Sequence, residues 1–173
     1  MIVVAIVGVL SALAIYGVRK YLLNAKTAEV RNAVGQMAKD AKASYERDST
    51  SPLILAPGTS AGLANNLCSS ASVSVPAGKA SIAGQKYQSA PSEWNADVAS
   101  PGKGFSCLRF AMSDPQYFMY NYAGTIGTAG TFAAIGMGDL NGDGNTSTFT
   151  LNGAVTAGVV FVAPNFAEIN PDE

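Results

Sequence analysis

The sequence predicts an α+β fold: a long N-terminal α-helix, apolar in its first half and amphipathic in its second, packed on a C-terminal antiparallel β-sheet of about four to five strands. Two observations carry this prediction. No proline occurs before Pro52, so a single helix of about 50 residues is allowed. Short segments with a period of two begin only after residue 105. A chain of 173 residues, 48% of them hydrophobic, suits one globular unit with an appendage.

Residues 1–18 are uncharged and mostly apolar, and Arg19 and Lys20 follow them directly. At 1.5 Å per residue they form a helix of about 27 Å, close to the roughly 30 Å of a bilayer's hydrocarbon core. A cleaved signal peptide fits poorly, because there is no basic n-region and the two charges stand where a small-residue cleavage site is expected. We therefore expect a hydrophobic helix that lipid or protein surrounds on every side.

Residues 19–50 continue the helix as an amphipathic segment with one apolar face. The apolar positions recur at the spacing of a helix with 3.6 residues per turn, and most charged residues fall elsewhere. The predicted face consists of Leu23, Val30, Val34, Met37, Ala41 and Tyr45. An antiparallel sheet that buries one side is the expected cover for this face.

Residues 51–104 are rich in Ser, Ala, Gly and Pro, which predicts long surface loops with a short helix near residues 62–67. Cys68 and Cys107 are the only two cysteines, and their spacing does not resemble that of a zinc or iron-sulfur site. They are expected to form a disulfide if this part of the chain lies outside the cytoplasm. Two buried free thiols are the alternative in a reducing compartment.

Residues 105–173 contain the short segments of β-branched and aromatic residues that predict the sheet. Turn-forming residues separate them, as at Ser113-Asp114-Pro115 and Asn152-Gly153. The aromatic side chains of residues 117–122 are expected to serve core and interface packing. The predicted strand segments are SCLRFAM (106–112), QYFMYNYAG (116–124), TFAAIGMG (131–138), STFTLNG (147–153) and GVVFVAP (158–164).

The distribution of charge argues against nucleic acid binding and against catalysis. Residues 19–48 hold seven basic and four acidic residues, whereas the rest of the chain holds four basic and eight acidic ones. An acidic C-terminal part does not favour a polynucleotide, while basic residues just after an apolar run suit a membrane surface. The chain has no histidine, which removes the commonest general base and zinc ligand. We expect no enzymatic activity and no required cofactor.

One segment, GDLNGDGNTST, resembles the first half of a calcium-binding loop. Asp139, Asn141 and Asp143 supply oxygen atoms at alternate positions, and Gly144 permits a sharp turn. The position that should carry a bidentate Glu is Thr150. Two interpretations remain: a weak Ca²⁺ site completed by main-chain carbonyls, or a tight hairpin turn built from Asn-Gly and Asp-Gly.

The first fifteen residues, MIVVAIVGVLSALAI, resemble the N-terminal helix of the type IV pilins. The family pattern runs close to Met-Ile-Val-Val-Ala-Ile-Ile-Gly-Ile-Leu-Ala-Ala-Ile-Ala-Ile, and eleven of the fifteen positions are identical, Gly8 among them. The rest of the chain resembles the larger type IVa major pilins more loosely. In the family a short basic leader and a Phe-Thr-Leu-Ile-Glu-Leu-like segment precede the residue that matches Met1, and neither is in the sequence given.

The resemblance implies a structural subunit that is held in the inner membrane and then assembled, helix against helix, into an extracellular, retractable pilus for adhesion and twitching motility. It implies a homo-oligomeric helical filament, served by the pilus assembly machinery and a prepilin peptidase. A type II secretion pseudopilin, a minor pilin and a monomeric membrane-anchored binding domain are the alternatives. The residues expected to pack in the filament core are Ile2, Val3, Ile6, Val7, Gly8, Leu10 and Leu13.

Two further expectations concern the assembled filament. In the family the helix often melts between the glycine that matches Gly8 and a proline, in whose place this chain has Tyr16; here melting would depend on Gly8, Ser11 and Gly17. Glu29, Arg31 and Lys39 are the candidates for ion pairs between subunits, which would set register more than net stability.

Overall fold

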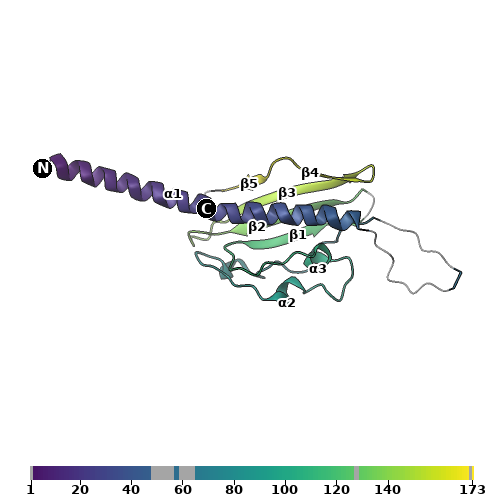
Figure 1. The fold of residues 1–173 in the computed structure, drawn as a ribbon. Coiled ribbons are helices and arrows are strands. Elements are labelled where there is room, and N and C mark those ends of the chain that lie inside the picture. The colour runs from purple at the N-terminus through teal and green to yellow at the C-terminus, as the bar shows by residue number, and fades with distance from the viewer. Residues whose placement is uncertain (1, 48–56, 59–64, 127–128, 172) are drawn as a thin grey trace.

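A computed structural model describes residues 2–47, 57–58, 65–126, 129–171 and 173, and confirms the predicted α+β fold. One long helix runs the length of the molecule, and its second half lies on a five-stranded antiparallel sheet (Figure 1). The elements are α1 (Ile2–Glu46), a 3-10 helix (Lys79–Ser81), α2 (Pro91–Trp94), α3 (Gly104–Leu108), β1 (Met119–Gly124), β2 (Thr131–Gly138), β3 (Ser147–Thr156), β4 (Val159–Val162) and β5 (Ala167–Ile169).

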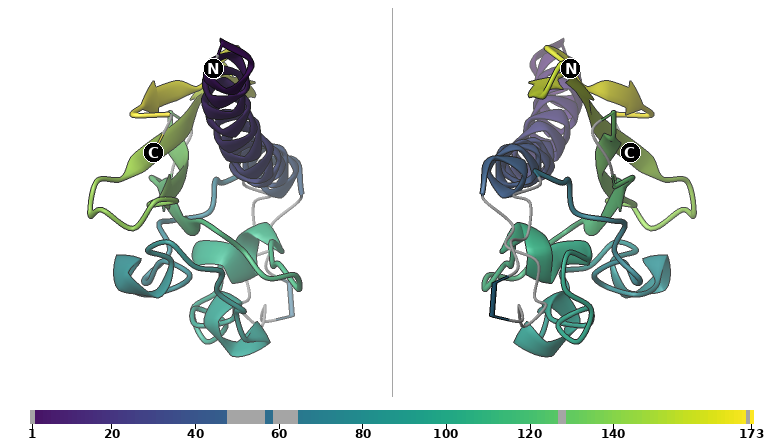
Figure 2. Two further views of the ribbon diagram at one scale, coloured as in Figure 1. Left: turned by 90° about the vertical axis from the view of Figure 1, so that its left-hand side faces the viewer. Right: turned by 90° about the vertical axis from the view of Figure 1, so that its right-hand side faces the viewer.

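The second half of α1 buries the face that its apolar spacing predicts. Of the predicted positions, Leu23 is partly buried and packs against the core, and the other five are fully buried. Small and polar residues beside them, Thr27, Ala33, Ala38 and Ser44, complete the buried face. Views along the helix show it lying across one side of the sheet (Figure 2).

The sheet has the strand order β1-β2-β3-β4, and β3 is long enough to pair with two partners on its far side. Its C-terminal half pairs with β4, and its N-terminal half pairs with β5. The register places Tyr120 and Phe149 on either side of Gly136, all on the side of the sheet that faces α1.

Close packing between α1 and the sheet depends on a glycine in β2. A Cβ atom added to Gly136 would lie 2.2 Å from Cγ2 of Val30 and 3.2 Å from Cγ2 of Val34. Carbon atoms in contact normally sit about 3.5–4.0 Å apart. The missing side chain therefore lets the helix approach the strand closely at this point.

The loop-rich segment extends the core beyond the edge of β1. Main-chain hydrogen bonds join residues 70–75 to the free edge of β1, so this edge is covered. Trp94 at the end of α2 is buried between Phe105 and Phe110, whose ring centroids lie 5.0 and 5.4 Å from its own. Of the short helix expected near 62–67, residues 62–64 lie outside the described residues, and residues 65–67 are not helical.

The prediction of a strand over residues 106–112 is wrong. Residues 104–108 form helix α3, whose Phe105 and Leu108 both enter the core from one side, as residues three apart on a helix do. Cys107 on α3 forms a disulfide with Cys68, the first of the two alternatives for these cysteines. The helix ends at Arg109, which adopts a left-handed conformation with φ of 64°.

Candidate functional site

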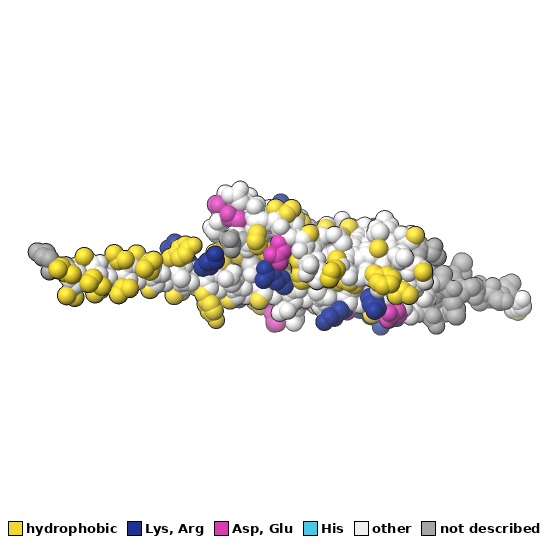
Figure 3. All heavy atoms as spheres, turned by 90° about the horizontal axis from the view of Figure 1, so that it is seen from above, with side chains coloured by type: hydrophobic (Ala, Val, Ile, Leu, Met, Phe, Trp, Pro, Cys, Tyr) yellow, Lys and Arg dark blue, Asp and Glu magenta, His cyan; other side chains and the backbone are white. Residues whose placement is uncertain are grey.

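The first half of α1 carries a large apolar surface that the rest of the described chain does not cover. It projects from the globular part as a rod with hydrophobic side chains along the face seen in Figure 3, and residues 2–18 are all exposed. A window of 18 residues in this helix has a mean hydropathy of 2.2, and none of its residues is buried. By length and composition α1 is able to cross a membrane, although a signal sequence would satisfy the same criteria.

The residues predicted to pack in a filament core all lie on this rod. The exposed fraction is 77% for Ile2 and 56% for Val7, although side chains of this kind are usually buried. A Cβ added at Gly8 would meet nothing within 4 Å. The other predicted positions, Val3, Ile6, Leu10 and Leu13, are exposed as well. The rod is therefore incomplete as a water-soluble structure.

The helix is continuous through Gly8, Ser11 and Gly17. The Ser11 hydroxyl donates a hydrogen bond to the Val7 carbonyl at 2.7 Å, a contact that serine makes inside helices. The expected melting of this stretch refers to an assembled filament and stays a prediction.

Two of the three candidate residues for ion pairs between subunits, Arg31 and Glu29, form hydrogen bonds within the subunit. Both Arg31 Nε and Nη2 donate hydrogen bonds to the carboxylate of Glu168 on β5, at 3.0 and 3.1 Å. The Arg31 guanidinium also lies 5.6 Å from the ring centroid of Phe149. Lys39 is exposed on α1. Among the described residues Lys39 forms no hydrogen bond or ion pair through its side chain. Arg31 holds β5 against the helix through its ion pair with Glu168.

Glu29 forms a second bond between α1 and the sheet, close to the point where the helix leaves the globular part. Its Oε1 accepts hydrogen bonds from the Tyr117 N–H at 3.0 Å and the Tyr120 hydroxyl at 3.1 Å. Burial raises the pKa of Glu29 above its ordinary 4.5, against the opposing effect of these hydrogen bonds and of the Lys86 charge. Burial, and then the charge of Glu29, likewise raise the pKa of Tyr120.

Two lysines flank Tyr117 beside this bond. The ammonium groups of Lys26 and Lys86 each lie 4.7 Å from the centroid of the Tyr117 ring, within the range of a cation–π contact. Sequence analysis missed this group, because Glu29 and Tyr117 are 88 positions apart and no local pattern links them. Only the packing of α1 on the sheet brings them together.

In the candidate calcium loop the side-chain oxygens accept hydrogen bonds from main-chain N–H groups of the same loop. The carboxylate of Asp139 accepts the N–H groups of Gly142 and Gly144, and Asn141 Oδ1 accepts that of Asp143. Asp143 Oδ1 accepts the N–H of Asn145, and this bond holds the pKa of Asp143 below its ordinary value. Among the described residues no three His, Cys, Asp or Glu side chains are grouped as a metal site. Residues 139–146 form the connection between β2 and β3, which is longer than a two-residue hairpin turn, and the weak Ca²⁺ site stays a prediction.

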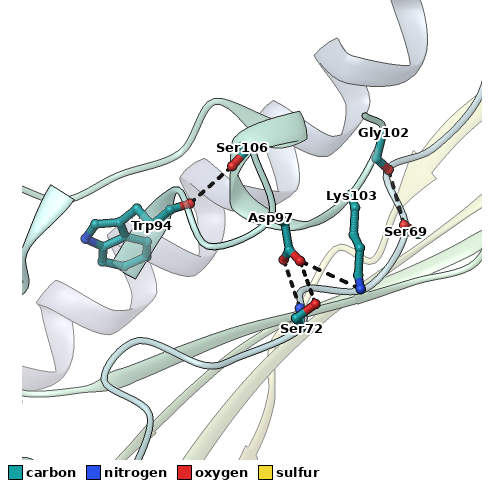
Figure 4. A network of polar contacts seen from close by, with 7 residues as sticks. All are labelled: Ser69, Ser72, Trp94, Asp97, Gly102, Lys103 and Ser106. Carbon is teal, nitrogen blue, oxygen red and sulfur yellow. Dashed lines mark hydrogen bonds and ion pairs between the residues drawn. The ribbon is translucent and has the colours of Figure 1, made fainter. Parts of the chain in front are cut away.

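Other buried or recessed polar groups serve the fold. Asp97 accepts hydrogen bonds from the N–H and hydroxyl of Ser72 and faces Lys103 at 3.7 Å (Figure 4). Burial would raise the pKa of Asp97, but these partners outweigh it and hold the pKa below its ordinary value. Gly104, at φ of 58°, leaves the room in which this carboxylate lies.

An open groove on the sheet, between Ser70 and the β3–β4 hairpin, is lined by small, apolar and uncharged polar side chains. Phe132, Asn152 and Phe161 are its larger members, and none of its lining residues is acidic, basic or a thiol. The groove therefore offers shape and apolar contact but no group able to transfer a proton near neutral pH.

Comparison with known proteins found no matching family model, no matching curated protein and no matching solved structure. What the structure defines is an architecture: an apolar N-terminal helix continued onto an antiparallel sheet, with a disulfide in the intervening region. This arrangement is consistent with a pilin-like fold. The exposed apolar rod is the feature that any function must account for.

Proposed function

We propose that this protein is the structural subunit of a type IV pilus, held in the inner membrane by the first half of α1 and assembled into an extracellular filament through the same surface. The observation that carries the proposal is a rigid apolar rod, exposed on all sides, that continues without a break into a helix packed on a folded sheet. Filament assembly requires the rod and the folded sheet in one chain. The rods pack together as the core, and the globular parts lie around them on the outside.

The energetics favour two successive environments for the rod. At about 25 cal/mol per Å², keeping even 1,000 Å² of apolar surface out of water is worth about 25 kcal/mol. The folding stability of a typical domain is about 5–15 kcal/mol. Exposure of the rod to water is thus prohibitive, and it moves directly from lipid to the rods of neighbouring copies. Lipid and neighbouring rods are both apolar, so one surface serves both states.

The partners of such a subunit are other copies of this chain, the pilus assembly machinery and a prepilin peptidase. The filament would serve adhesion and twitching motility. A type II secretion pseudopilin or a minor pilin would share the rod. Copy number and the presence of micrometre-long filaments distinguish these two from a major pilin.

Electron microscopy of sheared surface material from cells that express the full chain tests the proposal. A matched pair of substitutions sharpens it, since Val7 on the rod and Val98 on the globular part are both exposed, at 56% and 70%. Val7→Asp is expected to abolish filaments, whereas Val98→Asp keeps them. Filaments that form normally with Val7→Asp would refute the rod as the filament core, and a wild-type chain that stays in the membrane fraction after shearing would refute the filament itself.

A further inference from the structure

Basic side chains gather where α1 enters the globular part. Arg19 and Lys20 follow the apolar run directly, and Lys26 comes less than two turns later. Lys86 from the loop-rich segment joins them, because it shares the Tyr117 ring with Lys26. Three cations of the helix and one from the loop-rich segment therefore belong to this junction. Figure 3 shows Lys and Arg side chains where the rod meets the globular part.

The acidic residue shown beside these cations is Glu29, whose charge is partly balanced by that of Lys86. Glu29 is the first acidic residue of the chain, and its Oε1 is bonded to Tyr117 and Tyr120 on the sheet side of the helix. The basic residues of the helix before Glu29 thus present a positive potential that α1 itself does not neutralise.

The spacing along the helix matches the layers of a bilayer. If the hydrocarbon ends near Val18, the 1.5 Å rise places Lys20 about 3 Å and Lys26 about 12 Å beyond it. The first lies within the headgroup layer, and the long side chain of the second reaches back toward it. Tyr16 and Tyr21, exposed at 68% and 73%, stand on either side of the boundary, where aromatic side chains favour the membrane interface.

We infer that this junction, made of Arg19, Lys20, Lys26 and Lys86, binds the surface of an anionic phospholipid bilayer and seats the globular part on the membrane before assembly. The inference rests on the proposed function, because it requires the rod to be in lipid. An acidic surface of a second copy would also attract these cations, but it would not account for the flanking tyrosines or for the position of the charges at the end of the apolar run. The bilayer accounts for all three observations.

Quenching by brominated lipids measures which lipid surrounds the helix. The full chain with Tyr16→Trp is reconstituted into vesicles that mix phosphatidylcholine and phosphatidylglycerol, one of the two brominated in its acyl chains. Trp94, which is buried in the globular part, gives a constant background. At about 0.1 M salt we expect phosphatidylglycerol to bind more than tenfold more tightly than phosphatidylcholine, since each basic side chain near an anionic surface contributes about fivefold.

Two pairs of lysines on the same helix provide a matched control. Lys20→Gln with Lys26→Gln is expected to reduce the preference for phosphatidylglycerol about tenfold, because it removes two of the four basic side chains of the junction. Lys39→Gln with Lys42→Gln removes the same charge about 30 Å or more from the hydrocarbon edge, beyond several screening lengths, and keeps the preference.

Three outcomes would overturn the inference: equal quenching by the two lipids, an equal loss from both lysine pairs, or a preference that inorganic phosphate abolishes and chloride of equal ionic strength does not. The last would mark a site for free phosphate in place of a membrane surface. Equal quenching leaves the proposed function standing. Absence of quenching by either lipid would instead show that the rod is outside the bilayer, and would refute membrane storage.

Discussion

Replacing Gly136 by alanine tests whether α1 and the sheet are packed as closely as the structure shows. The new Cβ would lie 2.2 Å from Cγ2 of Val30, so the two groups must separate by about 1.3 Å or more to reach a normal contact. Val30 cannot simply rotate away, because a valine in a helix has one strongly preferred rotamer. The helix must therefore move off the strand, which also loosens the contacts of Val34 and Met37.

Overpacking of this kind costs about 1–3 kcal/mol. A second substitution identifies the cause of the loss: Val30→Ala alone removes two buried methyl groups and costs about 1–3 kcal/mol. Combined with Gly136→Ala, it makes room for the added methyl. The double variant should thus be more stable than the sum of the two single effects by about 1 kcal/mol or more.

Equilibrium unfolding of the full chain in detergent measures these differences. The single tryptophan, Trp94, reports on the transition because it is buried between two phenylalanines in the native state. Gly35→Ala on the same helix is the control, since a Cβ there meets nothing within 4 Å, and it should raise stability by up to about 1 kcal/mol. The close packing would be refuted if the Gly136→Ala variant unfolded at the same denaturant concentration as the wild type. It would also be refuted if the effects of Gly136→Ala and Val30→Ala simply added.

Three more predictions follow from the described contacts. Replacing both cysteines of the Cys68–Cys107 disulfide by serine should cost about 4 kcal/mol, since the bond spans 39 positions; unchanged denaturant midpoints would contradict this. Because burial raises the pKa of Glu29, its ionisation weakens the fold, so the contribution of Glu29 to stability is greatest below pH 4.5 and declines as the pH rises through its folded-state pKa. Glu29→Gln should lack this part of the pH dependence in unfolding titrations, and a pH profile identical to that of the wild type would disprove it. Glu168→Gln, which breaks the ion pair with Arg31, should lower stability by about 1 kcal/mol or less, because both groups are partly exposed. This loss should be smaller in high salt, and a larger loss that does not depend on salt would show that the pair is not an ordinary surface contact.

The parts of the fold that sequence analysis predicted are those with a repeated local pattern. The buried face of α1 follows from the 3.6-residue spacing of Val30, Val34 and Met37. Strand β2 follows from a short apolar segment that lies between clusters of turn-forming residues. Segment 106–112 has neither pattern, and its aromatic and apolar residues suit a short helix as well as a strand. Its helical form depends on contacts with α1 and Cys68, which no local window contains.

Strand β5 escaped prediction for a related reason. Its three residues, Ala167 to Ile169, are too few to establish a period of two, and all three are exposed. The strand exists because β3 offers a free edge at Thr148–Thr150 and because Arg31 binds Glu168. The same limit applies to the candidate site. The apolar rod is evident from composition alone, whereas the Glu29–Tyr117–Lys86 group depends on the packing of distant segments.

The continuity of α1 gives the two halves of the molecule a mechanical relationship. The helix has no proline, and between Gly17 and Gly35 it has no glycine, so the segment that crosses the junction contains none of the usual causes of a sharp bend. Glu29 and Arg31 then fasten this same segment to β1 and β5. A tilt of the rod must therefore turn the sheet with it. In the filament we propose, the packing of rods in the core would fix the orientation of every globular part on the outside, and contacts between globular parts would only refine it.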